Sequence, residues 1–144
     1  MITKLTHPSD QQLKRIMAIW LTGNLEAHQF IPNYYWMNNY SAVKKLLSTA
    51  EIYVAINDQQ ISAFLGLVDH SIWGIFVTSP FRHQGIGTQL VNAAKDNHAM
   101  LILSVYLKNP SAILFSEQNG FVIKQQTVDE NTNESKCQMS WLNH

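Results

Sequence analysis

The sequence predicts an α/β fold in which a mixed, α+β-type sheet of six to seven strands is flanked by about four helices. Short β-branched and aromatic runs alternate with helical stripes in the order β-α-α-β-β-β-α-β-α-β-β. The strand Ser71–Val77 is followed by a glycine-containing loop and a helix, and Leu101–Leu107 is followed by another helix. Because a helix crosses over between these two strands, we expect them to be parallel, whereas strands joined by tight turns are antiparallel.

The N-terminal part is predicted to hold one strand and one helix. Ile2–Leu5 forms the strand, and Ser9 or Asp10 caps the helix that follows. The helix carries an apolar stripe at i, i+3, i+4, i+7 and i+8. The stripe consists of Leu13, Ile16, Met17, Trp20 and Leu21. We expect Gly23 and Asn24 to end this helix, and residues 24–34 to form a connecting segment.

The middle of the chain is predicted to hold a second helix and three antiparallel strands. The helix runs from about Asn33 to Ser48, with an apolar stripe of Trp36, Tyr40, Val43 and Leu47. The polar turn Asn57–Gln60 joins the strands Glu51–Ile56 and Ile61–Val68. Asp69 and His70 then turn the chain into Ser71–Val77.

The C-terminal part is predicted to hold two helices and three strands. The first helix runs from about Gly87 to Asn97. Asn109 is expected to cap the second helix, with Pro110 at its first position and Gly120 just past its end. The remaining elements are the strand Leu101–Leu107, the strand Phe121–Thr127, the loop Val128–Lys136 and the strand Cys137–Leu142.

The composition narrows the class of protein. At 144 residues the chain has the size of a single domain, residues 1–144. Ten basic and ten acidic side chains cancel, which argues against nucleic acid as the main partner because phosphate-backbone binding needs a basic surface. We expect no membrane span and no signal peptide. A single cysteine, Cys137, excludes an internal disulfide, so we expect a cytoplasmic protein.

The same composition bears on assembly. Charged residues make up only 14% of the chain, and there are four Trp. Such a chain is expected to expose some apolar surface, either as an acceptor groove or as a dimer interface. The protein is therefore predicted to be a monomer or a homodimer, and no metal-ligating set is expected.

The junction between Ser71–Val77 and the next helix predicts an anion cradle. Glycines at 85 and 87 tolerate φ > 0, so that successive backbone N–H groups can converge on one point. The helix that follows adds its unpaired first-turn N–H groups and the positive end of its dipole. Arg82 supplies a full positive charge, and Thr88 supplies a hydroxyl. The dinucleotide-binding fingerprint is excluded, because Leu90 stands where it has a third glycine. The nucleoside-triphosphate loop is excluded, because it needs Gly-Lys-Ser/Thr and Gly87 is followed by Thr88 and Gln89.

Two motifs resemble those of the GNAT superfamily of acyl-CoA-dependent N-acetyltransferases. The stretch Arg82–Gly87 is similar to its Arg/Gln-x-x-Gly-x-Gly/Ala loop. The stretch Asn109–Phe121 resembles its signature Asn-x-x-Ala-x-x-Phe-Tyr-x-x-x-Gly-Phe, with matches at Asn109, Ala112, Phe115, Gly120 and Phe121. The resemblance covers roughly residues 50–125, and Ala27–Ile31 resembles a His-x-Phe-Ile/Leu segment of one bacterial branch.

This resemblance implies acetyl-CoA as the acyl donor, with CoA as a product. It implies that the two middle strands splay apart and that the pantetheine arm pairs with main-chain groups of Ile75, Phe76 and Val77. A backbone N–H near Ile75 or Phe76 would stabilise the oxyanion. Asn109 is implied to position the pantetheine side. The pyrophosphate would be held by the backbone N–H groups of Arg82, His83, Gln84, Gly85, Ile86, Gly87 and Thr88, the His83 side chain itself being loop surface.

On the acceptor side, the resemblance makes four residues candidates for substrate binding. These are His28, Phe30, Tyr34 and Tyr35. Acyl transfer needs a neutral amine, and a lysine-type amine has a pKa of about 10.4, so a base or a desolvating site must remove its proton. His28 is the first candidate for this base. Glu26, Asp69 and His70 are its rivals.

The leaving-group acid is where the sequence departs from the family. Ser116 stands where the family has tyrosine, and a serine hydroxyl is shorter and far less acidic. Tyr106 is a candidate substitute, although a core aromatic is the alternative interpretation. The predicted function is direct acetyl transfer to a primary amine of a small molecule or of a protein, with no covalent intermediate on Cys137. An acyl-CoA-binding regulatory module with decayed catalysis is the alternative, and a structural domain without a cofactor is a third hypothesis.

Overall fold

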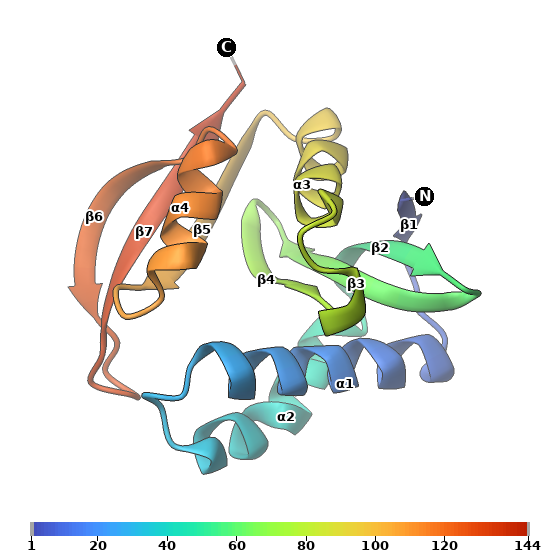
Figure 1. Ribbon diagram of the computed structural model, residues 1–144, viewed down its shortest axis with the longest axis horizontal. Coiled ribbons are helices and arrows are strands. Elements are labelled where there is room, and N and C mark those ends of the chain that lie inside the picture. The colour runs from blue at the N-terminus through green and yellow to red at the C-terminus, as the bar shows by residue number, and fades with distance from the viewer. Residues whose placement is uncertain (1, 144) are drawn as a thin grey trace.

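The computed structural model describes residues 2–143 and contains one seven-stranded sheet in the order β1-β2-β3-β4-β5-β7-β6 (Figure 1). The strands are β1 Ile2–Leu5, β2 Glu51–Asn57, β3 Gln60–Val68, β4 Ser71–Val77, β5 Met100–Tyr106, β6 Val122–Val128 and β7 Ser135–Leu142. The helices are α1 Asp10–Ala27, α2 Asn33–Leu47, α3 Ile86–Asp96 and α4 Pro110–Gln118, with a 3₁₀ turn at Ser79–Phe81. The predicted order of elements is confirmed, and most predicted bounds lie within one or two residues of these.

The predicted end of α1 at Gly23 and Asn24 is wrong, because the helix continues to Ala27. A Cβ at position 23 would overlap the ring of Phe76 on β4, so the glycine serves close helix–strand packing. Asn24 is buried inside the helix, and its side-chain Nδ2 donates to the carbonyl of Trp20 at 3.0 Å. The helix therefore brings one more turn, including Glu26, towards the middle of the sheet.

The sheet is covered on both faces, because alternate residues of a strand point to opposite sides. In β2, Ile52 and Val54 pack into a hydrophobic cluster with α1 and α2. Tyr53 and Ala55 pack into a second cluster, to which α3 and α4 contribute. At the N-terminus of α1, Ser9 and Gln12 form a reciprocal capping box, as expected for a helix that starts at Asp10.

The two parallel strands in the middle of the sheet meet at one point. Within residues 2–143, β4 pairs with β5 only at Ser71 and Ile102, where the N–H of Ile102 also donates to the carbonyl of His70 at 2.8 Å. Beyond this bridge the strands diverge, so that β1–β4 with α3 and β5–β7 with α4 form two halves of the molecule (Figure 1). In the part of the chain that the structure describes, no helix is long and apolar enough to cross a membrane.

Candidate active site

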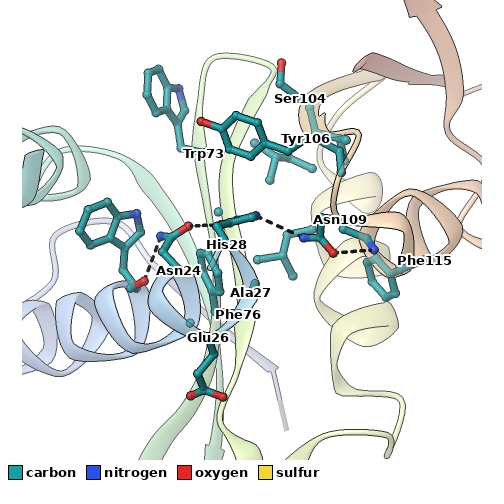
Figure 2. A pocket seen from close by; sticks show the side chains of 18 of the residues that line it. Asn24, Glu26, Ala27, His28, Trp73, Phe76, Ser104, Tyr106, Asn109 and Phe115 are labelled. Atoms are coloured by element: carbon teal, nitrogen blue, oxygen red, sulfur yellow. Dashed lines mark hydrogen bonds between the residues drawn. The ribbon is translucent and has the colours of Figure 1, made fainter. Parts of the chain in front are cut away.

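A cavity of about 730 Å³ lies between the diverging strands β4 and β5. Its wall is formed by α1, α2, both strands, α4 and the loop that follows β6. Figure 2 shows lining side chains from α1, β4, β5 and α4. Most lining side chains are apolar or aromatic, and those of formal charge are Glu26, Arg82, Asp129 and Lys136. A cavity of this size with few polar groups is typical of sites for small molecules.

The edge of β4 offers backbone groups to this cavity. The N–H of Thr78 donates to the carbonyl of Ser62 on β3 at 2.8 Å. Because backbone groups alternate along an antiparallel strand, those of Phe76 also face β3, whereas those of Ile75 and Val77 face the gap. Of the three residues expected to pair with the pantetheine arm, Ile75 and Val77 thus present N–H groups, and Phe76 presents its ring.

The glycine loop has the backbone geometry of an anion cradle. Gly85 has φ +82° at the N-cap of α3, where its lack of a side chain permits a left-handed turn. Within residues 2–143, the N–H groups of residues 83–88 have no hydrogen-bond acceptor, whereas the N–H of Arg82 donates to the carbonyl of Ser79 at 3.3 Å. The N–H groups available to an anion therefore start at His83, one residue later than expected.

Arg82 is anchored rather than free. Its Nε donates to the carbonyl of Val77 at 2.8 Å, and its Nη1 forms an ion pair with Glu26 Oε2 at 3.0 Å. The side chain thus joins the end of β4 to the last turn of α1. The pair is exposed, so its free-energy contribution is small, and a competing phosphate can displace the carboxylate.

A chain of side-chain hydrogen bonds crosses the cavity through His28 (Figure 2). Asn24 Nδ2 donates to a carbonyl, so its Oδ1 is the acceptor that faces His28 Nδ1 at 3.0 Å. Asn109 Oδ1 accepts from the N–H of Ala112 as the cap of α4, so its Nδ2 faces His28 Nε2 at 3.2 Å. His28 therefore carries its proton on Nδ1 and accepts at Nε2.

The surroundings of His28 keep the ring neutral. It stacks on Trp36, with ring centroids 5.4 Å apart, and meets the edges of Phe30 and Tyr106. Burial lowers the pKa of His28 to about 4. The ring is weakly basic, and the lone pair on its unprotonated Nε2 already accepts a hydrogen bond from Asn109. Both properties make it poorly suited to deprotonate an amine, so they argue against His28 as the base.

Comparison with known proteins identifies the family to which this architecture belongs. A family model described as an acetyltransferase (GNAT) domain matches residues 48–123, which include the glycine loop and the whole of the second motif. The chain belongs to the GNAT acetyltransferase family. It is an acetyl-CoA-dependent N-acetyltransferase, as the two motifs predicted.

Individual GNAT proteins resemble the chain over almost its full length. It is 29% identical over 132 residues to the peptidyl-lysine N-acetyltransferase YiaC of Escherichia coli, covering 90% of both chains. The solution structure of apo YjaB from Escherichia coli has a TM-score of 0.83 at 22% identity and covers 100% of this chain and 99% of its own. The PaiA N-acetyltransferase of Thermoplasma acidophilum, solved with coenzyme A, has a TM-score of 0.77 at 16% identity and covers 99% of each chain.

Both candidates for the leaving-group acid, Ser116 and Tyr106, are poorly placed to give a proton to the leaving sulfur. Ser116 is 3% exposed, and its Oγ donates to the carbonyl of Ala112 at 2.8 Å, so its proton stays within α4. Tyr106 donates its hydroxyl to Asp129 Oδ2 at 3.0 Å. Burial and the Asp129 carboxylate raise the pKa of Tyr106, which makes its phenol a weaker acid than usual.

The predicted acceptor residues divide between the cavity and its surroundings. His28 and Tyr35 line the cavity, whereas Phe30 packs behind His28 and Tyr106 and does not line it. Tyr34 is 66% exposed and lies outside it, because neighbouring residues of a helix point in different directions. Among the rival bases, Glu26 lines the cavity but is paired with Arg82. Asp69 and His70 form the β3–β4 turn and do not line it.

Sequence reasoning missed Asp129, which enters the cavity from the loop between β6 and β7. In the sequence this residue is one of several acidic and amide side chains in a polar loop. Its position depends on the strand order, in which β7 lies between β5 and β6 and brings the loop beside the end of β5. No local pattern of residues indicates that arrangement.

Proposed function

We propose that this acetyltransferase moves the acetyl group of acetyl-CoA to the side-chain amine of a lysine in a protein or peptide. The observation that carries the proposal is the open edge of β4, which faces a cavity that is also lined by aromatic and carboxylate side chains. The choice of lysine is supported by YiaC of Escherichia coli and YjaB of Salmonella typhimurium, both peptidyl-lysine N-acetyltransferases, to which the chain is 29% and 27% identical over nine tenths of its length.

In this proposal the coenzyme side uses backbone groups. The N–H groups of residues 83–88 bind the pyrophosphate at the start of α3. The pantetheine arm lies along the free edge of β4, and the N–H of Ile75 donates to the oxyanion of the tetrahedral intermediate. Asn109 caps α4 and fixes His28, so its effect on the coenzyme acts through the position of that helix.

Transfer occurs directly in a ternary complex. The amine nitrogen attacks the thioester carbonyl, the carbon–sulfur bond breaks, and CoA leaves. Cys137 is unsuited to carry the acetyl group, because it is buried on β7 at 2% exposure and does not line the cavity. The whole activity is assigned to the single domain of residues 1–144. A cytoplasmic setting is part of the proposal, since it supplies acetyl-CoA and suits a free cysteine.

The test is an acetylation assay with acetyl-CoA, a panel of lysine-containing peptides and a panel of small amines. We expect CoA release to depend on the lysine peptide, mass spectrometry to locate the acetyl group on the lysine side chain, and a lysine-to-arginine peptide to give only background. Turnover of small amines alone would contradict the choice of acceptor. Binding of CoA without turnover of either panel would favour the regulatory module with decayed catalysis.

A further inference from the structure

The Asp129 carboxylate is held at the cavity by groups from two directions. Its Oδ1 accepts from the N–H of Asn131 at 2.9 Å, within its own loop, and its Oδ2 accepts from the Tyr106 hydroxyl at 3.0 Å. Tyr35 on α2 lines the same cavity, and burial together with the Asp129 charge raises its pKa. The carboxylate is thus held by hydrogen bonds from β5 and from its own loop.

Asp129 also differs from the other charged groups of the cavity. Glu26 is neutralised by Arg82 at 3.0 Å. Within residues 2–143, Asp129 has no cationic group within 4.0 Å, and Lys136, which lines the same cavity from β7, forms no ion pair with it. His28 stays neutral. The cavity therefore holds one fixed carboxylate whose charge is available to a cationic ligand.

This carboxylate lies in the part of the cavity where the two middle strands have diverged. Ile75 of β4 and Tyr106 of β5 both come after the bridge between Ser71 and Ile102, and both line the cavity. The Tyr106 hydroxyl donates to Asp129, so the carboxylate and the proposed oxyanion donor belong to the same cavity.

We propose that Asp129 is the subsite for the acceptor ammonium: it binds the lysine Nζ and takes the proton that must leave before attack. This inference rests on the proposed function. The ammonium loses one proton to the carboxylate, and the neutral nitrogen then forms the new C–N bond. The second proton of that nitrogen ends on the leaving sulfur when the C–S bond breaks, giving the amide and CoA thiol. Asp129 returns its proton to solvent. Tyr106 is a positioning residue that holds the carboxylate.

The experiment compares the wild-type protein with Asp129→Asn and Glu130→Gln, using acetyl-CoA and a lysine peptide between about pH 7 and about pH 10. Asparagine keeps the oxygen that accepts from Asn131, so the loop retains its turn. Glu130 is the adjacent exposed carboxylate and does not line the cavity, so it controls for net charge. Thermal melting and the Kd for acetyl-CoA report on folding and on the coenzyme side.

For Asp129→Asn we expect kcat/KM to fall about 100-fold near pH 7, the size of a typical acid–base contribution. The loss shrinks below about tenfold near pH 10, because the amine, of pKa about 10.4, then loses its proton without help. The groups nearby that also titrate are Tyr35, Tyr106, Lys136 and His28, and they are present in both proteins. Glu130→Gln stays within about twofold of the wild type, and Tyr106→Phe loses about tenfold.

Two results overturn the proposal. One is an Asp129→Asn protein with wild-type kcat/KM near pH 7, and the other is an equal loss at all pH values, which would mark a structural role. In both cases the wild-type protein still acetylates the lysine peptide, so the proposed function stands. A wild-type protein that acetylates no lysine peptide overturns the proposed function and this subsite together.

Discussion

On the side of the cavity proposed for the coenzyme, the candidate binding groups are backbone amides from β4 and from the loop before α3. On the proposed acceptor side the candidates are side chains from α1, α2, β5 and the β6–β7 loop, held by hydrogen bonds such as Tyr106 to Asp129. The first side depends on local dihedral angles, and the second depends on how distant segments pack. Damage to the first should appear as lost coenzyme binding, and damage to the second as lost acceptor turnover or stability.

The largest expected effect is on the coenzyme side, at Gly85. A valine there must adopt φ near +82°, which is strained for a β-branched residue. The loop would change its conformation to relieve this strain, and its N–H groups would no longer point towards one anion. We expect Gly85→Val to weaken acetyl-CoA binding by about 100-fold, which corresponds to about 2.7 kcal/mol. Isothermal titration calorimetry measures it. Gly85→Asn, which tolerates a left-handed turn, should lose much less, and equal losses would contradict the assignment to backbone strain.

The variant Gly23→Ala tests how much the close contact between α1 and β4 contributes to the stability of the acceptor side. In Gly23→Ala the new methyl group meets the Phe76 ring, so we expect the free energy of unfolding to drop by about 1–3 kcal/mol despite the better helix propensity of alanine. Urea unfolding measures the change. Gly23→Ala combined with Phe76→Leu should recover part of the loss. A single variant as stable as the wild type would show that the ring moves aside without cost.

Ser116→Tyr tests the position at which this chain departs from its family. A phenol of ordinary pKa, about 10, directed into the cavity from α4 supplies a better proton donor than the serine hydroxyl. We expect the chemical step to become about tenfold faster in single-turnover experiments. Ser116→Phe adds the same ring without the hydroxyl and should not gain. A faster phenylalanine variant would point to packing, and a slower tyrosine variant would contradict our interpretation of this position.

The smallest expected effect concerns stability and pH at His28. The pKa of His28 is about 4 in the folded protein and about 6.5 in the unfolded chain, so the unfolded chain binds more protons between these values. The free energy of unfolding should therefore decrease as the pH falls from above 6.5 to about 4. The two pKa values give at most about 3 kcal/mol, which partial exposure of the ring to solvent lowers to about 1–2 kcal/mol. In His28→Gln this part of the pH dependence should vanish. The control is His83→Asn, at an exposed histidine, and it should leave this part of the pH dependence of stability unchanged.

The parts of the structure that follow from neighbouring residues were predictable from the sequence. The capping of α4 by Asn109, with Pro110 inside it and Gly120 at φ +90° behind it, is one example. The left-handed turn at Gly85 is another, since glycine between a strand and a helix readily adopts the positive φ that this turn needs. These features depend on interactions within about five residues, and residue identities report on such interactions directly.

The parts that depend on distant contacts were not predictable. Gly23 looked like a helix terminator, but what decides its role is the Phe76 ring, which lies on a strand far along the chain. His28 looked like a base, but its partners Asn24 and Asn109 occupy both ring nitrogens. Asp129 carried no signal because its neighbours in space are set by the order of β5, β7 and β6.

The link through His28 has a mechanical consequence. Among residues 2–143 the two halves of the sheet share one backbone bridge, at Ser71 and Ile102, so little main-chain bonding sets how far apart β4 and β5 stand at their far ends. There the imidazole spans from Asn24 on α1 to Asn109 at the start of α4 and acts as a spacer of fixed length. A longer or shorter side chain at position 28 would change the width of the opening for every substrate at once.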